Sequence, residues 1–310
     1  MTATPPLILV VTGPTGVGKT QVAAAMARLA PVEIVSADSG QVYRYLNIGT
    51  AKPSLDERAA VTYHGLDLVL PTERYSAGRF GAEARGWIAD IIARARMPVV
   101  AGGTGFYLRA LFEGLFEEPL LDPERRTRLA AVLAACDRAT LERWALRLDA
   151  GFKGGGSQRA ARVIEVALLT GRRLSALQLE APAVGGDCSP WYAVLTLPRP
   201  ILAERIAART QRMLESGLVD EVQRLLAAGV AKDAPGLGTV GYSEVMSMLE
   251  GKLQAADLAE AISAATRQYA KRQETWLRHQ LRGPVESFDA SGAPEALANE
   301  VLARYRAAAT

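Results

Sequence analysis

The chain is poor in the residues that build disulfide, metal or redox centres. Its 310 residues include only two cysteines and two histidines. Cys136 and Cys188 have neither metal-ligand nor redox-motif spacing, and so few cysteines are typical of a protein from a reducing compartment. His64 and His279 lie far apart along the chain, which excludes a histidine-rich metal site.

Long apolar runs and a strong charge of one sign are also missing. No apolar run reaches the length that spans a membrane, and residues 1–6 lack the basic start and apolar stretch of a signal peptide. We therefore expect a cytoplasmic protein without membrane association. The net charge of +3 permits contact with nucleic acid without indicating it, so local clusters of charge must decide that question.

The most informative motif is GPTGVGKT at residues 13–20, which fits the phosphate-loop pattern G-x-x-x-x-G-K-[ST]. It follows the apolar run 7–11 and precedes the alanine-rich segment 21–30, so its context is strand, glycine loop and helix. The glycines let backbone N–H groups point inward, and the helix adds its positive end. Lys19 supplies a charge and Thr20 a hydroxyl for magnesium. The loop is predicted to hold a polyphosphate, whose identity the motif leaves open.

Short apolar runs rich in valine or isoleucine alternate with helical patterns. The predicted strands are 7–11, 32–36, 98–101 and 192–196. Helical patterns at 21–29 and 77–96 lie between the first three, which predicts an α/β fold with a phosphate-loop NTPase-like parallel sheet core. Because ligands gather at the carboxyl ends of such strands, we expect Lys19, Asp38 and Thr104 around one crevice.

The middle of the chain has a different character. Residues 122–170 are largely helical in pattern, and the segment 122–173 contains 11 Lys or Arg against 6 Asp or Glu. Glycine-rich or loose stretches at 151–156 and 181–190 interrupt and close it. We predict a mainly helical insertion domain at 119–185, within an α/β core formed by 1–118 and 186–310.

Two polar loops offer candidate chemistry with alternatives. Asp38, at a strand end beside the phosphate loop, suits either a magnesium ligand or a general base that acts on an acceptor. Gln41 suits contact with the edge of a nucleobase or a hydrogen bond within its own loop. The segment Gly102–Gly105 either lets a ligand approach the backbone closely or only turns a strand into a helix.

Arginine and lysine residues at helical spacing also have two interpretations. On a helical wheel, Ile262, Tyr269 and Trp276 share an apolar stripe, with Lys271 and Arg278 on the opposite face. That face suits either an RNA phosphate backbone or solvent.

The other arginines are spaced in the same way. Arg159 and Arg162 share a face with Glu165, as a salt-bridged surface or a nucleic-acid contact would require. Arg205 and Arg209 are four residues apart, so either could reach a phosphate group or remain exposed.

Together these strings are far more specific than any one of them. The phosphate loop, SADSGQVYR at 36–44, IGTAKP at 48–53, GGTGFY at 102–107 and ATRQYAKRQETWLR at 265–278 resemble the tRNA dimethylallyltransferase family. Tyr75–Ala77, Gln158–Arg159 with Arg162, and Gly241–Tyr242 match as well. The resemblance extends from about residue 7 to residue 278.

The resemblance implies an activity and a set of site residues. The family transfers a dimethylallyl group from dimethylallyl diphosphate to N6 of adenosine 37, beside the tRNA anticodon, so the phosphate loop would hold diphosphate rather than ATP. Asp38 corresponds to the general base, Thr104 to a residue near the adenine and Arg209 to an arginine on the diphosphate. The expected diphosphate ligands are Gly13, Thr15, Gly16, Val17, Gly18, Lys19 and Thr20, with Mg²⁺ at Thr20.

The partners implied are the tRNA anticodon stem-loop and dimethylallyl diphosphate, bound by a monomer. The expected tRNA contacts are Asp38, Ser39, Gly40, Gln41, Thr104, Gln158, Arg159, Arg162, Lys271, Arg272, Gln273, Thr275 and Arg278. The chain departs from the family pattern at 63–67, which reads YHGLD where HHLID is common, and at 151–157, where a glycine-rich stretch replaces HPND.

Two other functions share parts of these motifs. A prenyltransferase that acts on free AMP or ADP would need the crevice but no basic outer surface. A nucleotide kinase, or an NTPase switch, would need a pocket for the ATP base and tight ATP binding.

Overall fold

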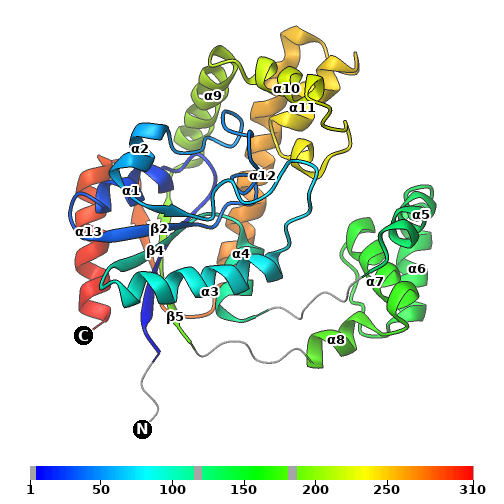
Figure 1. Cartoon of the computed structure of the whole chain (residues 1–310), viewed down its shortest axis with the longest axis horizontal. Coiled ribbons are helices and arrows are strands. Elements are labelled where there is room, and N and C mark those ends of the chain that lie inside the picture. Colours follow the sequence, from blue (N-terminus) through cyan, green and yellow to red (C-terminus); the bar gives the residue numbers. More distant parts are fainter. Residues whose placement is uncertain (1–4, 115–120, 181–186, 310) are drawn as a thin grey trace. The chain divides into compact units, whose positions relative to one another are not determined.

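A six-stranded parallel sheet forms the centre of the larger of two compact units. The computed structural model describes residues 5–114, 121–180 and 187–309. In this part of the chain the strand order is β3-β2-β4-β1-β5-β6, and every pairing is parallel (Figure 1). The strands are β1 (Leu7–Thr12), β2 (Val32–Ser36), β3 (Tyr63–His64), β4 (Met97–Ala101), β5 (Ser189–Thr196) and β6 (Val285–Asp289).

This architecture confirms the predicted α/β class and the four predicted strands. The sequence patterns did not reveal β3 and β6, which form the two edges of the sheet. β3 has only two residues, and four of the five residues in β6 are not buried, so neither presents the apolar run that identified the central strands.

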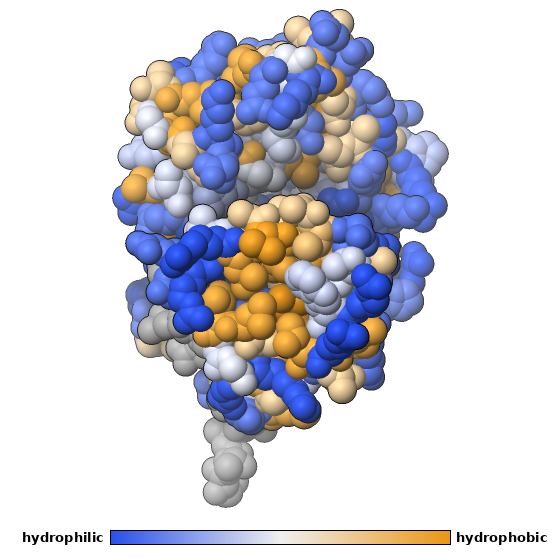
Figure 2. Space-filling view, turned by 90° about the vertical axis from the view of Figure 1, so that its right-hand side faces the viewer, coloured by the Kyte–Doolittle hydropathy of each residue, from blue (hydrophilic) through white to orange (hydrophobic). Residues whose placement is uncertain are grey.

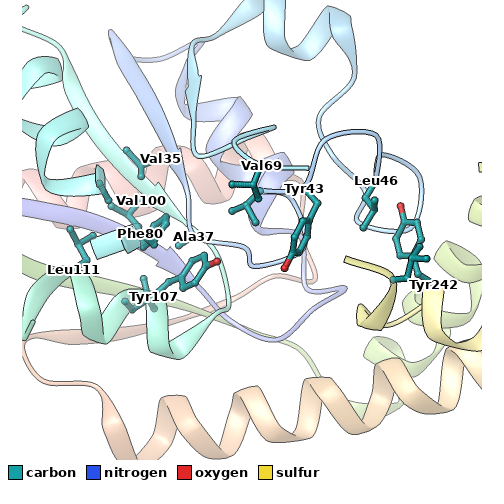
Figure 3. Close-up of a cluster of buried hydrophobic side chains, with 14 of the residues drawn as sticks. Val35, Ala37, Tyr43, Leu46, Val69, Phe80, Val100, Tyr107, Leu111 and Tyr242 are labelled. Carbon is teal, nitrogen blue, oxygen red and sulfur yellow. The ribbon is translucent and has the colours of Figure 1, made fainter. Parts of the chain in front are cut away.

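Helices cover both faces of the sheet. They are α1 (Lys19–Met26), α3 (Ala77–Ala93), α4 (Gly105–Phe112) and α13 (Pro294–Ala308). Ile8 of β1 belongs to the core cluster with α3 and α4, whereas its neighbour Leu9 belongs to the cluster with α1 and α13. Figure 3 shows the first cluster, in which the rings of Phe80 and Tyr107 stack with centroids 4.2 Å apart. Burial on both sides explains why the strands are apolar throughout.

The larger unit contains five further α-helices in its described residues. They are α2 (Leu55–Ala60), α9 (Arg199–Glu215), α10 (Leu218–Ala227), α11 (Tyr242–Leu249) and α12 (Leu258–Gln280), with two 3₁₀ turns, η1 (Pro235–Gly238) and η2 (Ala255–Asp257). The long helix α12 packs against α9 and α4, the helix that follows β4. Among the described helices, none combines the length and the apolar character that crossing a membrane requires.

The smaller unit, residues 113–184, is helical and has a core of its own. It contains α5 (Pro123–Ala134), α6 (Arg138–Leu148), α7 (Ser157–Thr170) and α8 (Leu174–Glu180). Its buried cluster consists of Leu133, Leu141, Ala145, Phe152, Ala160, Val163, Ile164, Val166, Leu174 and Leu177. The predicted domain boundaries, at 118/119 and 185/186, lie outside the described residues.

The smaller unit also exposes apolar side chains. Large ones that remain accessible include Val132, Trp144, Leu146 and Leu168. Figure 2 shows apolar side chains gathered on one face, with hydrophilic side chains along its margins. Inside the unit, the buried carboxylate of Asp149 accepts hydrogen bonds from the Gly151 N–H and from the Ser175 N–H and hydroxyl, at 2.6–2.9 Å.

A buried carboxylate organises the amino-terminal end of β2. Glu33 is 4% exposed and contacts Arg94 Nη2 and His64 Nε2 at 2.8 Å and Arg96 Nε at 3.2 Å. Burial by itself raises the pKa of Glu33, but the hydrogen bonds with Arg94 and His64 outweigh it, so the pKa lies below the ordinary value. Because the lowered pKa belongs to the folded state, the ionised carboxylate stabilises the fold.

We predict that Glu33→Gln lowers the free energy of unfolding by about 2 kcal/mol at pH 7, because the charged hydrogen bonds are lost. The difference from the wild type should shrink as the pH falls below about 4.5, where Glu33 itself becomes protonated. Denaturant titrations at several pH values measure this. Glu295→Gln is the control: its ion pair with Arg28 is exposed, so the loss should stay within about 0.5 kcal/mol. Equal losses for the two variants would contradict the assignment.

Candidate active site

The phosphate loop depends on glycine at two strained or crowded positions. Gly13 has φ +148°, and a Cβ there would lie 2.5 Å from the carbonyl oxygen of Leu195 in β5. Gly18 has φ +111° and caps the amino terminus of α1. A side chain at Gly13 would push the loop away from the sheet, and the left-handed backbone at Gly18 favours glycine. The position of the loop between β5 and α1 therefore explains why the motif has glycine at 13 and 18.

Lys19 is folded back into the loop that precedes it. Its Nζ donates hydrogen bonds to the carbonyl oxygens of Gly13 and Pro14, both at 2.9 Å. The pKa of Lys19 is lowered to about 8, chiefly by burial; the charge of Asp38 opposes this shift, and the neighbouring Arg209 adds to it. A partly buried ammonium next to a second cation favours an anion in the same space.

Asp38 and Thr104 come from neighbouring loops that hydrogen-bond to each other. The Asp38 carboxylate accepts a hydrogen bond from the Gly40 N–H at 2.9 Å. Thr104 Oγ1 accepts one from the Ser39 N–H at 3.0 Å, which joins the loop after β2 to the loop after β4. Lys19 and Asp38 line the same cavity, as predicted, whereas Thr104 is not among the residues that line it and joins the Asp38 loop through the bond with Ser39.

The glycines after β4 allow the loops to approach this closely. A Cβ on Gly102 would lie 2.2 Å from the carbonyl oxygen of Ala37, and one on Gly105 would lie 2.3 Å from the ring of Trp276. Neither distance is compatible with a side chain, since heavy atoms in contact sit near 3.5–4 Å. The segment thus does more than turn a strand into a helix, because it brings three parts of the chain together.

A cavity of about 1180 Å³ opens from the phosphate loop and Asp38 toward α9. Arg209 of α9 lines it and donates to Thr15 Oγ1 at 3.5 Å. Burial lowers the pKa of Arg209, although Asp38 raises it. Arg205, one turn earlier, donates instead to the carbonyl oxygens of Val17 and Ala290, at 3.3 and 3.1 Å. Both arginines line the cavity, and Arg205 also supports the phosphate loop through the Val17 carbonyl oxygen.

Comparison with known proteins identifies the family. A family model described as IPP transferase matches residues 41–280, and one described as isopentenyl transferase matches residues 6–64. A tRNA dimethylallyltransferase of Methylococcus capsulatus is 41% identical over 305 residues, which cover 96% of this chain and 98% of that protein. The chain belongs to the tRNA dimethylallyltransferase family.

Other members and solved structures agree. A tRNA dimethylallyltransferase of Solibacter usitatus is 43% identical over 88% of this chain and 90% of that protein. A crystal structure of the Staphylococcus epidermidis tRNA isopentenylpyrophosphate transferase is 27% identical, covers 98% and 99% of the two chains and has a TM-score of 0.69. That of the Bacillus halodurans tRNA isopentenylpyrophosphate transferase is 29% identical, covers 98% and 96%, and has the same TM-score. The resemblance read from the motifs is confirmed.

Two glutamines that the family motifs suggested as tRNA contacts are buried in this member of the family. The Gln41 amide accepts from the Ser36 hydroxyl at 2.8 Å and donates to the carbonyl oxygens of Thr50 and Ala51 at 3.2 Å. The structure shows the hydrogen bonds within its own loop, and Gln41 also lines the cavity, so contact with a nucleobase stays a prediction.

Gln273 is likewise buried, and its amide is bonded to the backbone at both ends. It was misplaced because the buried stripe of α12 is rotated relative to the predicted one, so that Ala270, Gln273 and Leu277 face inward.

Of the other predicted contacts, Gly40 is buried, whereas the rest are exposed or partly exposed. On α12 the side chains of Lys271, Arg272, Thr275 and Arg278 are exposed or partly exposed, and Arg272 lies over the ring of Tyr269 at 5.6 Å. In the smaller unit, Gln158 and Arg159 are exposed, whereas Arg162 pairs with Glu165 at 2.5 Å. For Arg162 the structure shows the salt bridge of the simpler interpretation.

Sequence reasoning missed a buried clamp on one wall of the cavity. The Glu221 carboxylate in α10 accepts hydrogen bonds from the N–H groups of Asn47 and Ile48 at 3.1–3.2 Å. The Tyr242 hydroxyl donates to Glu221 at 2.5 Å and accepts from the Gly49 N–H at 3.1 Å. The motif Gly241–Tyr242 was a signal for one half of the clamp, but an isolated glutamate in a helix gives none.

Tyr269 of α12 adds a hydroxyl near Asp38. Burial raises the pKa of Tyr269, and the charge of Asp38 raises it further, although hydrogen bonds with Thr104 and Ser39 act in the opposite direction. The phenol therefore stays protonated at neutral pH. Sequence reasoning placed Tyr269 only in an apolar stripe, because periodicity does not show where a hydroxyl points.

The residues around Thr20 fit a magnesium ion bound together with a phosphate. Thr20, Lys19 and Asp38 line one small pocket at the base of the phosphate loop. Magnesium in proteins commonly takes one or two side-chain oxygens, substrate phosphate oxygens and water. Among residues 5–114, 121–180 and 187–309 there is no cluster of three His, Cys, Asp or Glu side chains that could hold a metal without such a substrate.

We predict that the contribution of Lys19 to diphosphate affinity declines above pH 8. The wild type should bind inorganic diphosphate more tightly than Lys19→Met below that pH, and the ratio of affinities should fall by up to about tenfold per pH unit above it. Titration calorimetry at equal pH cancels the titration of diphosphate itself. A ratio that stays constant to about pH 10 would contradict the lowered pKa.

Proposed function

We propose that the protein transfers the dimethylallyl group of dimethylallyl diphosphate to N6 of adenosine 37 in the tRNA anticodon stem-loop and releases diphosphate. The names of its relatives support this activity, since they are called tRNA dimethylallyltransferases. A solved structure that is 27% identical, with a TM-score of 0.70, is a eukaryotic dimethylallyltransferase described as acting on tRNA. The observation that carries the proposal is that Asp38 lines the phosphate-loop cavity while its loop is bonded to Thr104.

On the donor side, the phosphate loop would hold the diphosphate. The backbone N–H groups that follow Thr15 converge with Lys19 at the amino terminus of α1, which favours an anion. As the bond between the allylic carbon and the bridging oxygen breaks, negative charge grows on that oxygen. Lys19 and Arg209 would stabilise it, because both cations are partly buried and line the cavity beside the phosphate loop. A magnesium ion at Thr20 would neutralise further charge on the diphosphate oxygens.

On the acceptor side, Asp38 would act as the general base. The N6 amine of adenine is a weak nucleophile, because its lone pair is delocalised into the ring. As the new carbon–nitrogen bond forms, the amine loses a proton, and Asp38 accepts it. Thr104, bonded to the Ser39 N–H, fixes the wall beside Asp38. A nucleobase that is stacked in the anticodon loop cannot reach such a site, so the adenine would be flipped out of the stack.

The basic residues favour tRNA over a free nucleotide as the acceptor. Lys271, Arg272 and Arg278 are accessible on α12, the helix whose buried side supports the active-site loops. A prenyltransferase for AMP or ADP has no need of such a surface. We further propose that the enzyme works in the cytoplasm as a monomer, and that Gln158 and Arg159 of the smaller unit extend the contact with tRNA.

We predict that Asp38→Ala lowers the rate of prenyl transfer by about 10²–10⁴-fold and leaves tRNA affinity nearly unchanged, because only proton acceptance is lost. The rate is measured by mass spectrometry of an anticodon stem-loop after incubation with dimethylallyl diphosphate and magnesium, and the affinity by filter binding.

Asp233→Ala, which removes an exposed carboxylate, is the matched control and should react like the wild type. Full activity in Asp38→Ala would refute the base assignment. A wild type that hydrolyses ATP and ignores dimethylallyl diphosphate would instead favour the nucleotide-kinase alternative.

We also predict that the double variant Lys271→Ala, Arg278→Ala binds tRNA more weakly and with a smaller dependence on salt. Each phosphate contact removed should lower the slope of log affinity against log salt by about 1. Lys232→Ala, an exposed lysine away from α12, should leave both quantities unchanged. If the double variant keeps the affinity and the slope of the wild type, this face of α12 does not contact RNA.

A further inference from the structure

One buried amide joins the two loops that the proposed reaction must hold together. Gln273 of α12 is 7% exposed. Its Oε1 accepts a hydrogen bond from the Thr15 N–H of the phosphate loop at 2.7 Å. Its Nε2 donates to the carbonyl oxygen of Gly103, in the loop after β4, at 2.9 Å. Both ends of the side chain are therefore committed to backbone groups of different loops.

The two hydrogen bonds of Gln273 hold the loops after β1 and β4 together beyond the point where the pairing of these strands ends. β1 and β4 are paired up to Val11 and Ala101, and the Gly102 N–H still reaches the Val11 carbonyl oxygen at 3.1 Å. Past this point the strand pairing ends, but the two loops stay close. A Cβ on Gly103 would lie 2.4 Å from Gln273 Nε2 and 3.0 Å from the Gly13 carbonyl oxygen, so the three segments meet with no spare room.

The helix that carries Gln273 is itself fixed. Trp276, one turn further along α12, packs against Gly105 at the start of α4. α12 also packs against α9, the helix that supplies Arg209. Thr15 is held from that side as well, since Arg209 donates to its hydroxyl at 3.5 Å. The Gln273 amide is therefore carried by a helix that is held in place, so it can fix the positions of the two loops that it bonds.

We propose that Gln273 is a positioning residue that sets the phosphate loop in register with the loop of Thr104. The proposal rests on the function proposed above: the first loop would hold the leaving diphosphate, and the second would flank the acceptor amine. Attack at the allylic carbon requires the two substrates to be aligned at about 3–3.5 Å, and an error of about 1 Å can cost about 10²-fold in rate. Gln273 touches neither substrate and acts through both loops.

The amide is the group that this position requires. Thr15 offers a donor and Gly103 an acceptor, so the side chain must accept at one atom and donate at the other. A carboxylate accepts at both atoms and leaves the Gly103 carbonyl oxygen without a donor. A protonated carboxyl group, in contrast, has one donor and one acceptor and has nearly the shape of the amide.

The first test compares Gln273→Leu with the wild type. We expect kcat to fall about 10–100-fold. The KM for the anticodon stem-loop should stay within twofold, because Gln273 is buried and does not meet the RNA. Gln223→Leu makes the same chemical change at an exposed position of α10 and should not alter kcat. If Gln273→Leu keeps the kcat of the wild type per folded molecule, with or without a lower melting temperature, the residue is only structural and the proposal is overturned.

The second test uses Gln273→Glu and pH. The ratio of its kcat to that of the wild type should rise as the pH falls from about 8 to about 6, as the carboxyl group gains the proton that replaces the amide donor. Lys19, Arg209 and Asp38 face the same loops in both proteins, so the ratio cancels their titration. A ratio that does not change with pH overturns the proposal.

A third measurement distinguishes the positioning role of Gln273 from the proposed function of the enzyme. Binding of inorganic diphosphate needs no RNA, and we expect it to weaken at least fivefold in Gln273→Leu, because the phosphate loop loses its anchor at Thr15. A wild type that binds diphosphate but does not modify tRNA contradicts the proposed function alone. A Gln273→Leu protein with unchanged diphosphate affinity contradicts the positioning role, whichever acceptor the enzyme uses.

Discussion

The site depends on how closely backbone segments approach one another at the carboxyl ends of the central strands. Gly13 lies against the Leu195 carbonyl oxygen, Gly102 against Ala37, and Gly105 against the ring of Trp276. At each contact a single methyl group would separate the partners. The absence of side chains therefore determines the geometry as much as the groups that do chemistry, and Asp38, Thr104 and Lys19 can reach one region only because the loops that carry them are in contact.

The lowered pKa values of the cations in the site follow from this close packing. The close packing of the loops partly buries both Lys19 and Arg209, and this burial lowers the pKa of each. Two partly buried cations beside one cavity, with Asp38 as the nearby carboxylate, are better stabilised once an anion joins them. The same pair then faces the oxygen on which charge grows as the leaving group departs, so ground-state binding and catalysis use one arrangement.

Much of this could be predicted from the sequence, because the central strands and the phosphate loop have strong local signals. Residues 7–11 are apolar throughout, and the glycine spacing that follows is typical of a loop that binds phosphate. What could not be predicted depends on long-range geometry. The edge strands β3 and β6 have no apolar pattern, and Glu221 and Gln273 become meaningful only when helices distant in sequence bring them to backbone groups of the site. Periodicity placed α12 correctly but misjudged the rotation of its buried face, so that Gln273 was expected at the RNA and lies in the interior.

The separate core of the smaller unit has an evolutionary consequence. The ten buried apolar residues in its described part form one cluster, and the Asp149 carboxylate joins the turn after α6 to the start of α8. Folding of the unit thus does not draw on the sheet for its interior. Substitutions on its surface away from Gln158 and Arg159 leave this core intact, so the module can change in sequence there without losing its own fold.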